Sequence, residues 1–300
     1  MSTMKVTFLG TTCMQPTKER NHSGIHVSFG SENLLFDCGE GIQRQMKIAG
    51  LKRSKITRIF ISHWHGDHAL GLAGLISTMA ADQVGHTLDI YGPKGSRKKF
   101  NHFKKAFPSM NGLPHKLHEV SAGGVILEGK DFIVTAEPLS HSVDCVGFSL
   151  KEKDRLKIDM KKAKKAGLVQ GPMLAEIQAG KNVRASGKLV KSKNVTSLVV
   201  GRKFAYVPDT RPCAGARSLA KNCDALIIES TFLFEDKKLA VKYDHMTAKE
   251  SAELATKAGA LQVYLTHPSI RYRDVSVLLK EAKKYHKKVK FAEDFMSFEV

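Results

Sequence analysis

The segment "SHWHGDH" at residues 62–68 places three imidazoles and one carboxylate within a few positions, directly after the apolar run at residues 59–61. Neutral imidazoles and carboxylates are the ligands that zinc commonly takes in catalytic sites. Alternate residues of an extended loop project to the same side, so His63 and His65 can converge on one ion while Asp67 and His68 turn toward another. One ion bound by all four would have no open position for water. The segment therefore predicts two catalytic metal ions.

A pair of ions needs further ligands from other parts of the chain. His141, Asp209 and His267 each follow a segment that resembles a strand, beside a Ser, Thr or Pro. Taken singly, each could equally be a polar residue that ends a strand. The cluster at residues 63–68 favours the ligand interpretation, because loops at one edge of a sandwich can bring such residues together.

Short apolar segments bounded by Gly, Asp, Asn or Pro recur along the chain and are predicted to be strands. The early strands follow one another as hairpins, and the later ones alternate with segments of helical periodicity. This order favours a mixed α/β sandwich over a pure dinucleotide-binding sheet. The predicted strands lie at residues 6–9, 25–29, 34–36, 59–61, 88–91, 132–135, 146–150, 197–200, 204–207, 225–228, 262–265 and 289–291, and the predicted helices at 41–49, 69–81, 95–105, 214–221, 247–257 and 275–285.

Length and composition allow one large domain with a well-buried core, since 42% of the 300 residues are apolar. The five cysteines are an odd number without a C-x-x-C pair, which favours free thiols in a reducing cytosol. No charged-then-apolar leader opens the chain and no apolar run is long enough to span a bilayer, so we expect a soluble, cytoplasmic protein. The formal charge of +19 indicates either a polyanionic partner such as nucleic acid or simply a basic, solvated surface.

One segment is exceptionally basic. Residues 151–193 contain 13 Lys or Arg against 4 Asp or Glu, a local charge of +9, and several glycines that interrupt any long element. We interpret the segment as a projecting basic arm inserted into a single domain of residues 1–300. The alternative is a long disordered loop.

The motif "HWHGDH" matches the H-x-H-x-D-H signature of the metallo-β-lactamase superfamily, and almost the whole chain resembles one of its branches, the short form of ribonuclease Z. Members of that family are endoribonucleases that process the 3′ end of tRNA. The opening motif alone identifies only the superfamily, whereas its combination with later stretches is far more specific. Those stretches lie at residues 8–25, 34–46, 61–75, 138–150, 166–183, 206–213, 225–232, 243–255 and 265–272.

The resemblance implies an αββα sandwich of the metallo-β-lactamase type with an inserted flexible basic arm, and two Zn²⁺ per subunit. Two divalent ions about 3.5 to 4 Å apart can activate water, polarise a scissile phosphate and offset charge on the leaving oxygen. In the family pattern Asp209 bridges the ions, and the two sets of three ligands are His63, His65 and His141, and Asp67, His68 and His267.

The resemblance also implies two roles in proton transfer. Asp67 would both bind metal and accept the proton of the attacking water. His245 in "YDHMTAKE" would donate a proton to the leaving ribose oxygen or stabilise transition-state charge, with Glu229 keeping it protonated. The same stretch also resembles a helix start, with Thr247 as the cap and Glu250 three residues later. Both interpretations are compatible.

Two regions are expected to bind RNA. The loop "PTKERN" at residues 16–21 matches a family pattern near the active site, where Lys18 and Arg20 can contact phosphate and Asn21 a base or ribose edge; without the resemblance it would be a polar turn. The arm at residues 151–193, including Gly171 and Pro172, corresponds to the family segment that binds the tRNA elbow. The short form is usually a homodimer, so we expect one here.

We therefore expect a zinc-dependent endoribonuclease that removes the 3′ trailer from precursor tRNA. The cut would follow the discriminator nucleotide, leaving a 3′-hydroxyl on the tRNA and a 5′-phosphate on the trailer. One alternative is a related phosphodiesterase or exoribonuclease that acts on other RNA or small diesters. Another is a non-catalytic RNA-binding protein with a decayed site, which the presence of all seven expected ligands argues against.

Overall fold

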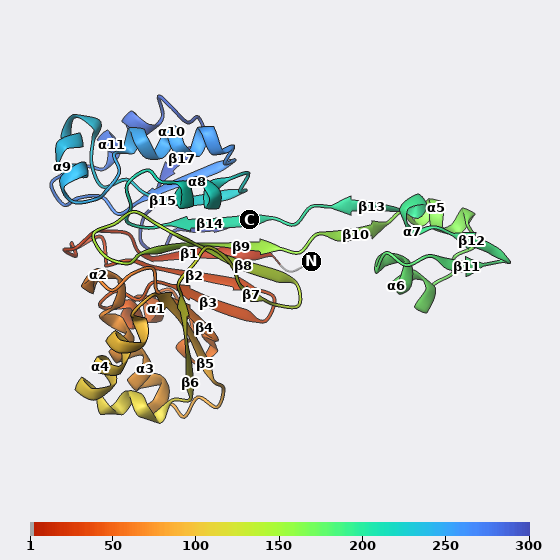
Figure 1. Ribbon diagram of the computed structural model, residues 1–300, viewed down its shortest axis with the longest axis horizontal. Coiled ribbons are helices and arrows are strands. Elements are labelled where there is room, and N and C mark those ends of the chain that lie inside the picture. The colour runs from red at the N-terminus through yellow and green to blue at the C-terminus, as the bar shows by residue number, and fades with distance from the viewer. Residues whose placement is uncertain (1–2) are drawn as a thin grey trace. The chain divides into compact units, whose positions relative to one another are not determined.

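The computed structural model describes residues 3–300 and divides the chain into two compact units (Figure 1). The first unit contains residues up to 128, residues 134–150 and residues 203–300. The second contains residues 129–133 and 151–202, which include the predicted arm. No helix within residues 3–300 is long and apolar enough to cross a membrane.

The first large sheet has seven strands, most of them from the first 120 residues. Neighbouring strands β1, β2 and β3 are antiparallel, whereas β3 to β6 run parallel to one another. The order across the sheet is β18 (Ser297–Glu299), β1 (Met4–Gly10), β2 (Gly24–Phe29), β3 (Glu32–Phe36), β4 (Arg58–Phe60), β5 (Leu88–Pro93) and β6 (His115–Val120).

The second large sheet also has seven strands and comes mainly from the later part of the chain. Strands β14 to β17 are parallel, so their carboxyl ends meet at one edge. The order is β17 (Val289–Phe291), β16 (Gln262–Thr266), β15 (Ala225–Glu229), β14 (Lys203–Val207), β9 (Val146–Glu152), β8 (Phe132–Pro138) and β7 (Gly124–Glu128).

Aromatic side chains fill the space between the two sheets. The ring of Phe36 lies 4.8 Å from that of Phe60 and 5.6 Å from that of Phe204, and Phe60 also meets Phe148 at 5.4 Å. All four side chains are fully buried. Each ring removes a large apolar area from water, so this layer is a principal source of the stability of the sandwich.

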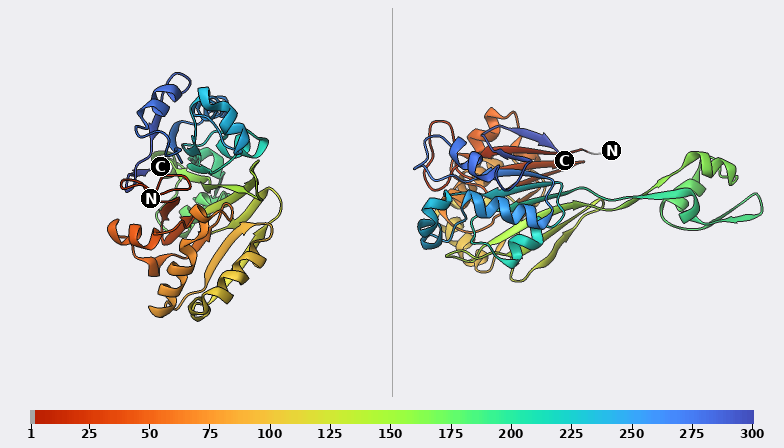
Figure 2. Two further views of the ribbon diagram at one scale, coloured as in Figure 1. Left: turned by 90° about the vertical axis from the view of Figure 1, so that its left-hand side faces the viewer. Right: turned by 90° about the horizontal axis from the view of Figure 1, so that it is seen from above.

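Helices cover the outer face of each sheet, with those from the early and late parts of the chain on opposite sides (Figure 2). Separate apolar clusters join the first sheet to α1, α3 and α4, and the second sheet to α8, α10 and α11. The predicted αββα sandwich is therefore confirmed. The helices are α1 (Ile42–Ile48), α2 (Gly66–Ala69), α3 (Gly71–Ala81), α4 (Ser96–Ala106), α8 (Ala214–Ala220), α9 (Lys237–Lys242), α10 (Ala248–Ala258) and α11 (Ser276–Ala282), with short 3₁₀ turns at Arg53–Lys55, Pro108–Gly112 and Phe234–Asp236.

The second unit has a small apolar core of its own. Strand β10 (Arg155–Ile158) pairs with β13 (Thr196–Val199), and β11 (Val183–Ala185) pairs with β12 (Lys188–Val190). Helices α5 (Met160–Lys165), α6 (Pro172–Gln178) and α7 (Ser192–Val195) complete the unit. Its core consists of Ala163, Leu168, Ile177, Val183, Ala185, Val190 and Val195. The alternative of a disordered loop therefore does not describe this segment.

Candidate metal centre

The carboxyl ends of parallel strands from both sheets supply the polar residues of one site, and all of these residues belong to the first unit. In the first sheet, Asp37 follows β3 and His63 lies just beyond β4. In the second sheet, Asp209 follows β14 and His267 follows β16, while His141 lies beyond β8. Carboxyl ends of parallel strands are where open α/β sheets commonly bind ligands.

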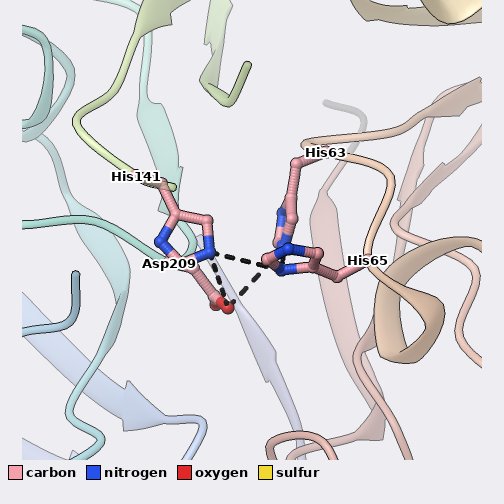
Figure 3. A group of neighbouring side chains, drawn as sticks. All are labelled: His63, His65, His141 and Asp209. Carbon is pink, nitrogen blue, oxygen red and sulfur yellow. Dashed lines mark hydrogen bonds and ion pairs between the residues drawn. The ribbon is translucent and has the colours of Figure 1, made fainter. Parts of the chain in front are cut away.

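Four of the predicted ligands form a first group (Figure 3). The Nδ1 atom of His65 lies 3.1 Å from Nε2 of His63 and 3.3 Å from Nε2 of His141. The Oδ2 atom of Asp209 lies 3.7 Å from the His63 nitrogen and 3.9 Å from the His141 nitrogen. Three ring nitrogens and one carboxylate oxygen therefore converge on a volume that fits one divalent cation.

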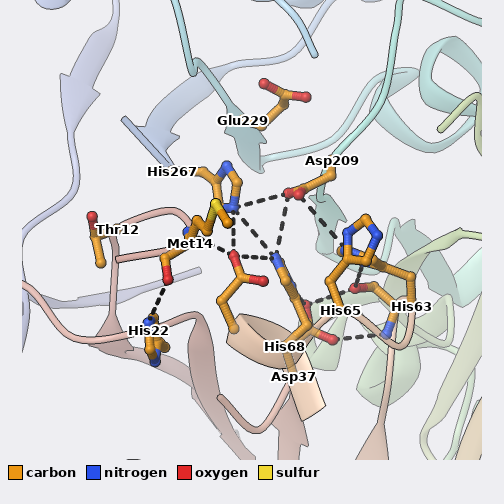
Figure 4. Close-up of polar contacts among 12 residues, drawn as sticks. Thr12, Met14, His22, Asp37, His63, His65, His68, Asp209, Glu229 and His267 are labelled. Atoms are coloured by element: carbon orange, nitrogen blue, oxygen red, sulfur yellow. Dashed lines mark hydrogen bonds and ion pairs between the residues drawn. The ribbon is translucent and has the colours of Figure 1, made fainter. Parts of the chain in front are cut away.

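Asp67, His68 and His267 form a second group. Figure 4 shows His68 and His267 of this group beside Asp209. The Nε2 atoms of His68 and His267 are 3.3 Å apart and lie 3.5 and 3.4 Å from Oδ2 of Asp67. The other oxygen of Asp209, Oδ1, lies 3.5 Å from the His68 nitrogen and 3.2 Å from the His267 nitrogen. The two oxygens of one carboxylate thus face the two groups.

Most of the histidines are oriented through the ring nitrogen that faces away from the centre. The Nδ1 atoms of His63 and His267 lie 3.0 and 3.2 Å from the hydroxyl oxygens of Ser62 and Thr231. The Nδ1 atom of His141 lies 3.0 Å from the backbone carbonyl oxygen of Asp244. Such contacts orient the imidazole and leave its other nitrogen for a metal.

Asp37 orients the loop of residues 62–68 through hydrogen bonds to its residues. Its carboxylate is fully buried and accepts hydrogen bonds from the backbone N–H and the hydroxyl of Ser62, from the Tyr206 hydroxyl and from Nδ1 of His68. The adjoining turn packs tightly on the same loop, because a Cβ on Gly39 would lie 2.3 Å from the carbonyl oxygen of Asp67. Sequence reasoning missed Asp37, although it too is a carboxylate directly after a predicted strand.

The donor set fits cations rather than a hydrogen-bonded core. The Oδ1 atom of Asp209 is buried and accepts no hydrogen bond within residues 3–300. Burial alone would lower the pKa of His68, but Asp209, Asp67 and Asp37 raise it well above its ordinary value, so these carboxylates draw positive charge to this position. A buried carboxylate without a hydrogen bond is costly unless a cation compensates it. The residues present therefore fit divalent metal ions.

His245 and Glu229 form an ion pair beside the two groups. The Nδ1 atom of His245 lies 3.0 Å from Oε1 of the fully buried Glu229. Burial would lower the pKa of His245, but the charge of Glu229 and its hydrogen bond outweigh burial and raise this pKa to about 9. The backbone N–H of Thr210 and the hydroxyl of Thr231 donate to Glu229 and fix its position.

The segment after His245 begins a helix, as expected. Thr247 and Glu250 form a capping box at the start of α10, and Arg211 donates from both terminal nitrogens to the Glu250 carboxylate. Arg211 also donates to the backbone carbonyl oxygen of His245. The helix cap thus holds His245 in place through Arg211.

Three residues of this region have left-handed backbone conformations. The φ angles of Asp37, Asp244 and His267 are 58°, 56° and 62°. For residues other than glycine this region costs on the order of 1 to 3 kcal/mol. Such strain commonly occurs where a side chain must point in a functionally required direction.

The loop predicted to bind RNA is anchored to the first unit by its own side chains. Arg20 donates to the hydroxyl of Thr11 and to the backbone carbonyl oxygen of Ala292, at 2.7 and 2.6 Å. The Asn21 side chain donates to the carbonyl oxygen of Glu40, whereas Lys18 is exposed. Gly171 and Pro172 lie in the second unit, at the start of α6.

Known proteins resemble this chain over nearly its full length. Ribonuclease Z of Methanothermobacter thermautotrophicus is 40% identical over 298 residues, covering 99% of this chain and 97% of that protein. Ribonuclease Z of Chlamydia muridarum is 36% identical over 299 residues, covering 100% and 98%. Among solved structures, human tRNase Z, short form, is 27% identical with a TM-score of 0.72, covering 98% of each chain.

Two family descriptions match parts of the chain. "Anti-Pycsar protein Apyc1" matches residues 4–131, and "Beta-lactamase superfamily domain" matches residues 170–268. Neither covers half of the chain, so the assignment depends on the full-length relatives. Given their identity and coverage, this chain belongs to the ribonuclease Z family and has its metallo-β-lactamase fold.

Proposed function

We propose that this chain is a zinc-dependent endoribonuclease that removes the 3′ trailer from precursor tRNA. It would cut after the discriminator nucleotide and leave a 3′-hydroxyl on the tRNA and a 5′-phosphate on the trailer. The relatives named ribonuclease Z support this activity. The observation that carries the proposal is the position of Asp209, whose two oxygens each face one group of three further ligands at the strand ends.

Two Zn²⁺ would be held at this centre. His63, His65 and His141 would bind one ion and Asp67, His68 and His267 the other, with Asp209 between them. When bound, such a pair activates water, polarises the scissile phosphate and offsets charge on the leaving oxygen. The histidines bind without cancelling the charge of the ions, which leaves the centre attractive to a phosphodiester.

Asp67 and His245 would move the protons. Burial would raise the pKa of Asp67, but His68 and His267 lower it overall to well below its ordinary value, so this carboxylate is ionised. In the proposed mechanism this ionised carboxylate would accept the proton of the attacking water. The backbone N–H of Met14 holds Oδ2 of Asp67 at 2.8 Å. His245 uses Nδ1 to contact Glu229, so its Nε2 is the nitrogen that would donate to the leaving ribose oxygen.

The substrate would be bound by two basic regions. Lys18 would contact phosphate near the centre, in a loop whose shape Arg20 and Asn21 maintain. Residues 151–193, with Gly171 and Pro172, would form an arm inserted into the domain of residues 1–300 and would bind the folded part of tRNA. Its excess of Lys and Arg favours phosphate contacts with little base specificity.

The chain would work as a homodimer in the cytoplasm. The resemblance to the short form of this family supports the dimer, because that form is usually dimeric. All five cysteines are free thiols, which fits a reducing compartment. Sedimentation of the purified protein would test the dimer directly.

Cleavage of two RNAs of equal length tests the activity. A precursor tRNA should be cut once, after the discriminator nucleotide, while an unstructured RNA should remain intact. Progressive shortening of both from one end would instead support an exoribonuclease. Binding without any cleavage by metal-loaded protein would support a non-catalytic RNA-binding protein. Metal analysis of the same sample should find about two zinc ions per chain.

A further inference from the structure

Helix α4 carries a second basic surface that the proposed arm does not include. Residues 90–118 contain seven Lys or Arg and no Asp or Glu, a local charge of +7. Together with the segment at residues 151–193, this stretch carries most of the +19 of the chain. The stretch therefore contains no carboxylate that could neutralise its own Lys and Arg side chains.

The amphipathic character of α4 directs this charge to solvent. Phe100 is 2% exposed and packs in the core beneath the helix, with Phe103 partly buried beside it. Lys98, His102 and Lys105 are exposed on the opposite side. Apolar packing on one face therefore fixes a row of cationic side chains on the other.

Two adjacent hollows run along this basic face. The first, of about 540 Å³, is lined by Lys98, His102, Lys104 and Lys105 together with polar and Pro residues, and contains no carboxylate. The second, of about 410 Å³, is lined by Arg97, His115, Lys116 and His118 among others. In contrast, a hollow of about 380 Å³ beside α10 is lined by Glu250 and Glu253 as well as by lysines. Two carboxylates border the α4 surface: Asp89 contacts His118, and Glu119 accepts from the backbone N–H of Arg97. The side chains that line its hollows are nevertheless cationic or neutral, as a polyanion requires.

The α4 surface is connected to the metal-binding loop. Trp64 stands between the ligands His63 and His65, and its indole N–H donates to the Ser96 hydroxyl at 2.7 Å. Ser96 is the first residue of α4, and the Trp64 ring also packs against Phe103 with 5.6 Å between centroids. Helix α4 therefore packs directly against the loop that carries His63 and His65.

An exposed aromatic ring distinguishes the expected type of nucleic acid. Phe107, at the end of α4, is 48% exposed next to Lys105 and Pro108. Proteins that bind single strands without sequence preference combine a basic groove with exposed rings on which bases stack. The α4 hollows are lined mostly by Lys, Arg and His, whose cationic side chains favour contacts with phosphate.

We infer that the α4 surface binds the single-stranded 3′ trailer of the substrate by its phosphates, on the far side of the scissile bond from the folded tRNA. This inference depends on the proposed function, because only a trailer-cleaving enzyme presents such a strand at the metal centre. Each phosphate contact would contribute to affinity for long trailers and would have no role with a trailer too short to reach α4.

Trailer length and charge reversal test the inference together. The variant carries Lys98→Glu and Lys105→Glu, and the matched control carries Lys283→Glu and Lys287→Glu, two exposed lysines just after α11 with the same change in net charge. Each protein is given precursor tRNAs with trailers of about two and about twenty nucleotides, chosen to fall short of and to cover a typical single-strand site. KM, kcat and the salt dependence of KM are measured.

We expect the α4 variant to raise KM roughly tenfold for the long trailer only and to lower the salt slope by about one to two, with kcat unchanged. The control should behave as wild type. An equal rise in KM with both trailers would overturn the inference and would indicate that α4 binds the folded tRNA. An equal rise in KM in the control would also overturn it, because the effect would then come from net charge alone. An unchanged α4 variant would also overturn it. Cleavage of the short-trailer precursor by wild type tests the proposed function separately.

Discussion

The two units of this chain differ in what their residues have available for chemistry. In the first unit, buried carboxylates and imidazoles meet at the ends of strands and most of them are already held by a second contact. In the second unit, a core of small and aliphatic residues supports a surface with 13 Lys or Arg within residues 151–193. The comparison leads us to expect that turnover and affinity for the folded tRNA are separable, because one unit fixes the groups proposed to react and the other mainly presents charge.

Removing the carboxylate of Asp209, which faces both ligand groups, should have the largest effect. Asp209→Asn removes the negative charge and replaces one of the two carboxylate oxygens with an NH₂ group that cannot bind a cation, so turnover should fall by on the order of 10³-fold or more. Metal content should fall as well, while binding of precursor tRNA remains. Asp274→Asn, at an exposed carboxylate, is the matched control and should be neutral. Loss of tRNA binding in Asp209→Asn would contradict the division between the units.

Removing the charge of Glu229 should reduce turnover without removing metal. Glu229→Gln keeps the shape of the side chain but no longer stabilises a protonated His245, so kcat should fall roughly 10²-fold. The metal content should stay at the wild-type value. His245→Ala should cause a similar loss, and the double variant should lose little more, because the two residues act as a unit. Additive losses would assign them separate roles.

A cavity in the core of the second unit should destabilise that unit alone. Ile177 is fully buried, so Ile177→Ala should lower the free energy of unfolding of this unit by about 2 to 4 kcal/mol. Hydrogen exchange should accelerate within residues 151–202 and remain slow in the strands that carry the metal ligands. Leu226→Ala, in the core of the second large sheet, should accelerate hydrogen exchange in the first unit and leave exchange within residues 151–202 unchanged. Uniform acceleration in both variants would show that the units unfold together.

Removing charge from α5 should weaken substrate binding and leave the chemistry intact. Replacing Lys161, Lys162, Lys164 and Lys165 with Ala should raise KM for precursor tRNA about tenfold and reduce its dependence on salt. The value of kcat should be unchanged, and hydrolysis of a small phosphodiester should not respond. A matching loss with the small diester would mean that the second unit supports the centre itself.

Replacing Glu250 should have the smallest effect, a loss of stability that depends on pH. Burial would raise the pKa of Glu250, but hydrogen bonds from Arg211 and Thr247 lower it overall. A pKa that is lower in the folded state than in the unfolded state stabilises the fold at pH values above the unfolded-state pKa, which is about 4. This contribution to the free energy of unfolding is lost as the pH falls through the folded-state pKa. Glu250→Gln should therefore cost about 1 kcal/mol at neutral pH and less under acid conditions. Denaturant unfolding at both pH values measures the difference, and equal costs would contradict it.

Much of the fold could be predicted, because apolar segments bounded by turn residues mark its central strands. Every predicted strand and helix overlaps an observed one, although residues 69–81 form two helices, α2 and α3. The strands that were not predicted, such as β6 and β11, are at sheet edges or in the second unit, where partial exposure weakens the apolar pattern. Glycines in residues 151–193 lie between short elements, with φ of 77° at Gly167 and 84° at Gly180, so they end elements without excluding them.

Some residues of the candidate metal centre could be predicted from local sequence, whereas others depend on contacts between distant parts of the chain. His63, His65, Asp67 and His68 share one short loop, so their spacing alone indicates a metal site. Asp209 and His267 come together only because strands far apart in sequence end at one edge, which the parallel pairing of β14, β15 and β16 brings about. His141 joins them from the end of β8, which lies in the same sheet. The buried partners Asp37 and Tyr206 depend on contact between the two sheets, and no pattern along the chain encodes that contact.

The left-handed backbone at His267 and Asp37 has a consequence for saturation mutagenesis of these positions. Glycine and asparagine adopt this conformation readily, whereas valine and isoleucine have a branch at Cβ that opposes it. Libraries at these codons should therefore separate into two classes, inactive proteins that accumulate normally and inactive proteins that are degraded. Steady-state abundance would then distinguish the demands of the main chain from the demands of the side chain at a single residue.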